Sequence, residues 1–194
     1  MIIGINGKAG VGKSSIIKQC FEDNKINHLY FSGATLDPWV DFVGIPKEKE
    51  TTSTDGKKTS YIELVRPKYF EQDEVEAIFI DELNKYASSD IPKNSPILRQ
   101  LIDIAERGRS LGIILFSAEQ FRSVIYDRVT GNCSTHAYGR TNAIEISKKD
   151  YQFIPNVYKN MMTRLKQGEY IIQNPIFRSV LKIKFPKPVY KQFK

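Results

Sequence analysis

Short apolar runs recur along the chain, and each of them ends in glycine or polar residues. Runs of this length, rich in isoleucine, phenylalanine and tyrosine, predict buried strands of a parallel sheet. Stretches with apolar residues three and four positions apart lie between them and predict helices. The expected strands are 1–5, 28–32, 77–81, 113–116, 135–138, 168–173 and 179–185, and the expected helices are about 12–22, 96–107 and 155–165.

The order of these elements predicts the fold class. Strands that alternate with helices favour an α/β fold, with a mostly parallel sheet and helices on both of its faces. Ligands of such sheets bind beyond the carboxyl ends of the strands, so residues that follow the strands are the first candidates for a site. The whole sequence, 1–194, is expected to form one domain. Within it, a polar stretch over 45–60 with a turn signal at Asp55-Gly56 is expected to form a surface loop, an insertion or the tip of a hairpin.

The pattern G-x-x-x-x-G-K-[ST] begins just after the first expected strand and runs into the first expected helix. Its glycines let the backbone turn tightly around an anion, and the exposed N–H groups and the helix N-terminus complement the negative charge. The pattern predicts that Lys13 reaches the β- and γ-phosphates of ATP and that Ser14 ligates Mg²⁺. The expected nucleotide-binding residues are Gly7, Lys8, Ala9, Gly10, Val11, Gly12, Lys13, Ser14 and Ser15.

Two acidic residues, Asp81 and Glu82, follow the apolar run 77–80. An aspartate at the end of a strand can hold Mg²⁺, and a glutamate one position on can polarise a water molecule for attack on the γ-phosphate. The alternative is a buried strand followed by a solvated acidic turn. Because the pair accompanies a phosphate-binding loop at this spacing, the sequence favours ATP hydrolysis, with Gln120 as a third polar residue beyond a strand.

Charge is distributed unevenly along the chain, whose net charge is +7. Residues 140–194 hold twelve lysines and arginines against three acidic residues, which suits a polyanionic partner such as nucleic acid. A solvated basic surface is the alternative. No apolar stretch approaches the ~18 residues that span a bilayer, so we expect no membrane association. Cys20 and Cys133 lack C-x-x-C spacing, which favours a reduced, cytoplasmic setting.

Together with the phosphate-binding loop, several segments within residues 77–190 resemble HerA-type ATPases of the HerA–FtsK superfamily. The resemblance implies a RecA-like P-loop ATPase of the additional-strand class. Such proteins form a ring, usually a hexamer, that moves double-stranded DNA with the energy of ATP. The segments that carry the resemblance are 80–87, 102–112, 117–121, 131–135, 138–140, 168–169 and 185–188.

The resemblance also assigns roles to three further residues. Gln120 would lie near the γ-phosphate and help to orient water; a hydrogen bond to a loop is the alternative. Arg107 or Arg109 would act as an arginine finger on the ATP of a neighbouring subunit, with Arg107 slightly preferred. The alternative for each arginine is a surface ion pair, for instance with Glu106 or Asp103.

The β-barrel that precedes the P-loop of HerA proteins is expected to be absent here, which places a companion nuclease in doubt as a partner. A compact motor core of this kind also resembles viral genome-packaging ATPases of the same superfamily, whose partners would include a capsid protein and whose location would be the host cytoplasm. The segment 33–46 faintly resembles MoxR-type AAA+ ATPases, which would act on protein. A switch or scaffold that binds ATP but turns it over slowly is the remaining alternative.

Overall fold

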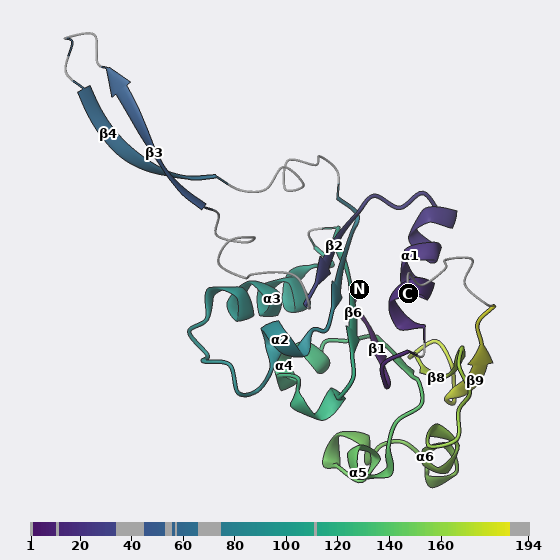
Figure 1. The fold of residues 1–194 in the computed structure, drawn as a ribbon. Coiled ribbons are helices and arrows are strands. Elements are labelled where there is room, and N and C mark those ends of the chain that lie inside the picture. Colours follow the sequence, from purple (N-terminus) through teal and green to yellow (C-terminus); the bar gives the residue numbers. More distant parts are fainter. Residues whose placement is uncertain are drawn as a thin grey trace. The chain divides into compact units, whose positions relative to one another are not determined.

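The computed structural model describes residues 2–10, 12–33, 45–52, 56, 58–65, 75–110 and 112–186 (Figure 1). The chain divides into two compact units. One comprises residues 1–33 and 75–194, and the other comprises residues 34–74. The first unit carries the sheet, the helices and every residue of the candidate site.

Seven strands of the described residues form one sheet in the order β2-β5-β6-β1-β7-β8-β9. The first five strands of that order run parallel, and β8 and β9 extend the sheet in antiparallel pairing. The strand β6 lies between β1 and β5, which is the additional strand of the predicted class. The strands are β1 (Ile2–Asn6), β2 (His28–Ser32), β5 (Ala77–Asp81), β6 (Ile114–Glu119), β7 (Thr135–Tyr138), β8 (Glu169–Gln173) and β9 (Leu181–Lys184).

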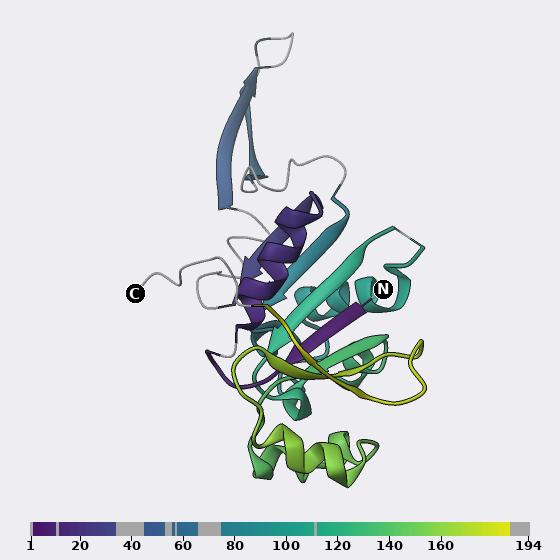
Figure 2. The ribbon, with the colours of Figure 1, turned by 90° about the vertical axis from the view of Figure 1, so that its right-hand side faces the viewer.

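Helices lie on both faces of this sheet, as predicted (Figures 1 and 2). The helix α1 covers one face, and α2, α3 and α4 lie on the other. The α/β class with a mostly parallel sheet is therefore confirmed. The helices and 3-10 turns are α1 (Lys13–Asp23), α2 (Asn84–Ala87), α3 (Pro96–Arg107), η3 (Arg122–Val124), α4 (Asp127–Thr130), α5 (Ala143–Ile146), η4 (Lys149–Tyr151) and α6 (Asn156–Met162). Of the described helices, none is long and apolar enough to cross a membrane.

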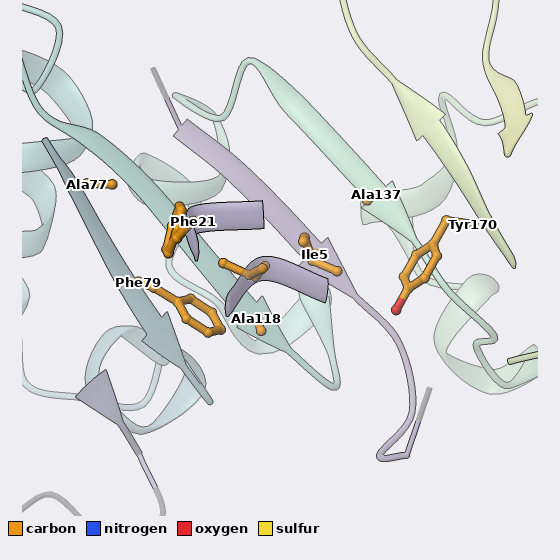
Figure 3. Close-up of a cluster of buried hydrophobic side chains, with 8 residues drawn as sticks. Ile5, Phe21, Ala77, Phe79, Ala118, Ala137 and Tyr170 are labelled. Carbon is orange, nitrogen blue, oxygen red and sulfur yellow. The ribbon is translucent and has the colours of Figure 1, made fainter. Parts of the chain in front are cut away.

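The core between α1 and the sheet holds the phosphate-binding region in place. Phe21 of α1 is fully buried and lies near Phe79 of β5 (Figure 3). Its ring meets Phe79 and also Phe116 of β6 edge-on, with centroids 6.5 and 4.8 Å apart. Burying such a side chain stabilises a fold by about 2 kcal/mol. Ile5, Phe79 and Ala118 line the same face because alternate residues of a strand point the same way. The packing fixes α1, and with it the loop before it, against the carboxyl ends of β1 and β6.

A second core, centred on Tyr138, Tyr151, Met162 and Ile171, joins β7 and β8 to the α5–α6 region. The helix α6 confirms the helix expected at about 155–165. The elements α5 and η4 were not predicted, because segments of three or four residues are too short to show helical periodicity. The strand expected at 113–116 also continues to Glu119. Its last residues alternate polar and apolar, which hid them from a search for continuous apolar runs.

The polar stretch predicted over 45–60 as a surface loop or a hairpin tip belongs to a hairpin in the second unit. Its described residues form an antiparallel hairpin of β3 (Ile45–Thr52) and β4 (Lys58–Val65), in which Ile45 pairs with Val65 and Thr52 with Lys58. Nearly all of these side chains are exposed, and Lys49 forms an ion pair with Glu63 across the ladder. Because neither face is buried, the strands lack the apolar alternation by which a half-buried strand is recognised. Residues 34–44 of the MoxR-like segment lie outside the described residues.

Candidate active site

The loop between β1 and α1 has the backbone that a phosphate cradle needs. Gly7, Gly10 and Gly12 have φ angles of 147°, 79° and 92°, a region that glycine adopts without the steric cost of a side chain. Gly7 also packs closely on the neighbouring loop, since a Cβ atom there would lie 3.1 Å from the Gly139 Cα. Val11 lies outside the described residues. The described part of the loop therefore has a shape that depends on its glycines.

Lys13 reaches back across this loop. Its side chain is only 9% exposed, and its Nζ donates to the carbonyl oxygens of Gly7 at 2.8 Å and Lys8 at 3.1 Å. Burial lowers the pKa of Lys13, while the carboxylates of Asp81, Glu119 and Glu82 oppose that shift. The ammonium group is thus held at the centre of the loop, where an anion bound by the loop would meet it.

Ser14 and Asp81, the two expected metal ligands, lie in direct contact. The Ser14 hydroxyl donates to Oδ2 of Asp81 at 2.5 Å, although the two residues are 67 positions apart in the sequence. The Tyr30 hydroxyl donates to the same oxygen at 3.2 Å. Burial and the Asp81 charge raise the pKa of Tyr30 to about 12, so this hydroxyl keeps its proton at neutral pH. A hydroxyl and a carboxylate are oxygen ligands of the kind that Mg²⁺ takes, so this pair fits the ion.

Glu82 occupies a strained turn immediately after β5. Its φ angle is 58°, a left-handed conformation that costs an ordinary side chain about 1 kcal/mol. The turn packs against Gly33, where a Cβ atom would lie 2.9 Å from the Glu82 Cβ. The Leu83 N–H bonds to the Ala118 carbonyl at 3.1 Å and fixes the turn to the end of β6. Strain of this kind is often found at functional sites, because the surrounding structure must hold it in place.

One cavity of about 170 Å³ brings the predicted residues together. It lies beyond the carboxyl ends of β5 and β6, the position where ligands bind in open α/β sheets. The phosphate-binding loop, the acidic pair and Gln120 all contribute to its wall. The lining residues are Ala9, Gly10, Gly12, Lys13, Ser14, Ser15, Asp81, Glu82, Ala118, Glu119 and Gln120.

The two arginine candidates lie away from this cavity. Arg107 ends α3 and Arg109 follows it, so both precede β6, whereas the cavity is beyond that strand's carboxyl end. Arg107 forms an exposed ion pair with Asp103, with Nη2 and Oδ1 3.1 Å apart. Glu106 is paired instead with Arg128. The structure therefore does not join either arginine to the cavity of its own chain.

A buried polar cluster that the sequence analysis missed lies on the sheet face away from α1. In the sheet register, Asn6 of β1 pairs with Glu119 of β6 and with Tyr138 of β7. Gly4 pairs with Ser117 and with His136 in the same way. These side chains are almost fully buried. The missing side chain of Gly4 leaves room for Glu119 Oε1 and His136 Nδ1, each 3.5 Å from where a Cβ would stand. The alternation of polar residues at 117 and 119, and at 136 and 138, could have revealed this face.

Burial shifts the pKa values of Glu119 and His136 in opposite directions. It raises the pKa of Glu119 to about 7, against the opposing effects of Ser117, Arg122 and Lys13. It lowers the pKa of His136 to about 4, and the Arg122 charge adds to that effect. Burial also raises the pKa of the Cys133 thiol to about 12. Near neutral pH the cluster therefore holds a neutral imidazole, a neutral thiol and a glutamate close to its titration midpoint.

We expect the Glu119→Gln substitution to change how stability depends on pH. Because its folded pKa is raised, Glu119 contributes stability that is present at low pH and is lost as pH rises from its unfolded value, ~4.5, to about 7. His136, whose folded pKa is lowered, contributes stability that is lost as pH falls from its unfolded value, ~6.5, to about 4. Glutamine at position 119 removes the pH dependence that Glu119 causes and leaves the one that His136 causes. The variant should therefore gain stability relative to wild type between pH 5 and pH 8, on the order of 2 kcal/mol in urea unfolding.

The exposed Glu22→Gln serves as the control for this measurement, because its carboxylate lies on the solvent side of α1. Its stability should follow the wild-type pH dependence. Parallel curves for wild type and Glu119→Gln would show that the folded protein does not hold a proton on Glu119 in this range.

Comparison with known protein families and with curated proteins finds no match for this chain. Solved structures with a similar fold include the genome packaging NTPase B204 from Sulfolobus turreted icosahedral virus 2. Its complex with sulfate is 17% identical, with a TM-score of 0.60 over 94% of this chain and 95% of that one. Its complex with ATP-gammaS is 16% identical, with a TM-score of 0.59 over 94% and 96%. B204, the DNA-packaging ATPase from Sulfolobus Turreted Icosahedral Virus, is 17% identical, with a TM-score of 0.58 over 97% and 98%.

At these identities the likeness establishes the fold alone, and it extends over nearly the full length of both chains. The specific resemblance to HerA is not confirmed by these comparisons and stays a prediction. The protein therefore has the α/β fold of the genome-packaging NTPases, with its phosphate-binding loop, acidic pair and Gln120 around one cavity.

Proposed function

We propose that this chain is an ATP-hydrolysing motor subunit that moves double-stranded DNA, and that genome packaging is its process. The observation that carries the proposal is the cavity that the phosphate-binding loop, Asp81, Glu82 and Gln120 share. The solved structures of similar fold support it, because they are described as genome-packaging NTPases and one was determined with ATP-gammaS.

In this proposal the triphosphate lies on the N–H groups of the loop and on the N-terminus of α1. The Lys13 ammonium leaves the carbonyl oxygens of Gly7 and Lys8 and donates to the β- and γ-phosphate oxygens, which carry more negative charge. Ser14 and Asp81 would hold Mg²⁺, and Ser15 continues the cradle. The bound ion would neutralise negative charge that develops on the phosphate oxygens.

Glu82 is the proposed general base. A water molecule attacks the γ-phosphorus, the bond from that phosphorus to the oxygen bridging to the β-phosphate breaks, and ADP and phosphate result. The proton that the water loses passes to the Glu82 carboxylate. Gln120 lines the same cavity. Its amide can form hydrogen bonds with the water and with the γ-phosphate, and so fix the direction of attack.

The arginines are proposed to act between subunits. Arg107 or Arg109 cannot serve the cavity of its own chain from the amino end of β6, but an exposed guanidinium can reach the cavity of a neighbouring copy. A ring, with six subunits as the expected number, would place one such arginine beside each nucleotide. To reach that nucleotide, Arg107 would have to give up its ion pair with Asp103. This costs little, because an ion pair exposed to solvent is weak.

Double-stranded DNA is the proposed partner because the carboxyl-terminal part of the chain is strongly basic. A capsid protein would be the second partner of a packaging motor, acting in the host cytoplasm. The second candidate function is a HerA-type translocase, favoured by the sequence segments that resemble that family, with a companion nuclease as its partner. A MoxR-like remodeller would act on protein instead.

The test is the ATPase rate with and without linear double-stranded DNA, together with the native mass. We expect DNA to stimulate phosphate release and the mass to be close to that of six subunits. Lys13→Ala is the control, since it removes the ammonium that meets the phosphates, and heparin controls for non-specific polyanion binding. An ATPase rate that responds to unfolded protein but not to DNA would favour the remodeller and contradict the DNA motor.

A further inference from the structure

One carboxylate oxygen of Asp81 accepts hydrogen bonds from hydroxyl groups on two different elements. Ser14 donates to Oδ2 from the start of α1 at 2.5 Å, and Tyr30 donates to it from β2 at 3.2 Å. Ser14 belongs to the phosphate-binding pattern, but no sequence motif includes Tyr30. The two hydroxyl groups together limit the orientations that the carboxylate can take.

The sheet register explains how Tyr30 reaches this carboxylate. Tyr30 is level with Phe79, whereas Asp81 lies two residues farther along β5, about 7 Å away along the strand. Both Phe79 and Asp81 point to the α1 face, because they are two positions apart. A side chain as long as tyrosine, lying along that face, covers this offset, and a phenylalanine would fill the same space without the hydroxyl.

The Tyr30 ring is itself held in place. It packs against Phe79 with ring centroids 5.1 Å apart, and the Lys18 Nζ lies 3.7 Å from the centroid of the ring. The negative face of an aromatic ring attracts a cation placed over it, so this contact holds the ring in place. Lys18 is one helical turn beyond Ser14 on α1, so the helix that supplies the serine also supports the tyrosine.

We propose that Tyr30 is a positioning residue of the metal site, which holds the Asp81 carboxylate beside Ser14 before nucleotide and Mg²⁺ arrive. The proposal rests on the proposed function, because it assigns the metal to Ser14 and Asp81. Groups that orient a metal ligand without touching the metal typically change metal affinity by 10–100-fold when they are lost. Tyr30 makes such a contact in the folded chain.

The test is the substitution Tyr30→Phe, read out by nucleotide binding and not by turnover. A fluorescent ATP analogue is titrated onto the full chain in EDTA and then at increasing Mg²⁺. We expect affinity in EDTA to stay within about twofold of wild type, because the loop and Lys13 are untouched. We expect the half-saturating Mg²⁺ concentration to rise about tenfold.

Two further variants interpret this result. Tyr158→Phe removes a hydroxyl from a partly buried tyrosine of α6 and should leave the Mg²⁺ dependence unchanged. Asp81→Asn removes a proposed metal ligand, so its half-saturating Mg²⁺ concentration sets the largest increase that loss of the site can cause. An unchanged Mg²⁺ requirement in Tyr30→Phe would overturn the positioning role, whether or not its melting temperature falls. Failure of the wild-type chain to bind the analogue at all would instead overturn the proposed function.

Discussion

Glu82→Gln is expected to bind ATP as tightly as the wild type and to hydrolyse it on the order of 10³-fold more slowly. The amide has nearly the same size as the carboxylate, so it fits the strained turn at φ 58° and the cavity wall without new contacts. It cannot accept a proton from the attacking water at neutral pH. Binding of a fluorescent ATP analogue and the release of phosphate are measured on the same preparation.

The control for this variant is again Glu22→Gln, which makes the same chemical change on the exposed side of α1. Its rate should equal that of wild type. Turnover at the wild-type rate in Glu82→Gln would remove Glu82 as the base. The remaining carboxylates of the cavity wall, Asp81 and Glu119, would then be the candidates to test.

Arg107→Ala should reduce ATP hydrolysis by on the order of 10³-fold or more while leaving ATP binding intact, since a finger supplied by a neighbour acts on the transition state. Mixing this chain with Lys13→Ala should restore part of the activity. In a mixed ring, an Arg107→Ala subunit keeps a complete cavity and receives the arginine of a Lys13→Ala neighbour. The rescue follows from the position of Arg107 at the amino end of β6, away from its own cavity.

The same mixing is repeated with Arg109→Ala, because Arg107 ends α3 and Arg109 lies two positions beyond it. Arg107→Lys keeps the charge but loses the planar fork that binds phosphate oxygens in pairs, so it should recover little activity. Asp103→Asn removes the surface partner of Arg107 and should not slow turnover. If neither arginine variant is rescued by Lys13→Ala, the proposal that this segment acts between subunits is wrong.

Local features made much of the site predictable. The glycines of the loop, Lys13 and Ser14 are neighbours in the sequence, so one short stretch shows the whole pattern. Asp81 and Glu82 follow a short apolar run that can only be a buried strand in an α/β chain. These patterns are recognisable because the backbone geometry and the chemistry of a few consecutive residues specify them.

The two strands of the hairpin in the second unit were not predicted, for the opposite reason. The side chains of these strands are exposed on both faces, so apolar and polar residues do not alternate along them. Only the backbone pairing, from Ile45–Val65 to Thr52–Lys58, defines the strands. The polar cluster around Glu119 was missed because burial of a charged residue is uncommon and depends on which strands are neighbours.

By itself, the sequence determined the phosphate-binding loop, the acidic pair and the alternation of strands and helices, because each is a pattern of residue types within a short stretch of the chain. The tertiary structure alone decided that β6 lies between β1 and β5, which brings Gln120 to the cavity that the loop and the acidic pair line. It also decided that Tyr30 meets Asp81 across 51 positions and that Arg107 lies away from its own cavity. Strand order and register are set by packing among distant segments, and no short stretch of sequence carries that information.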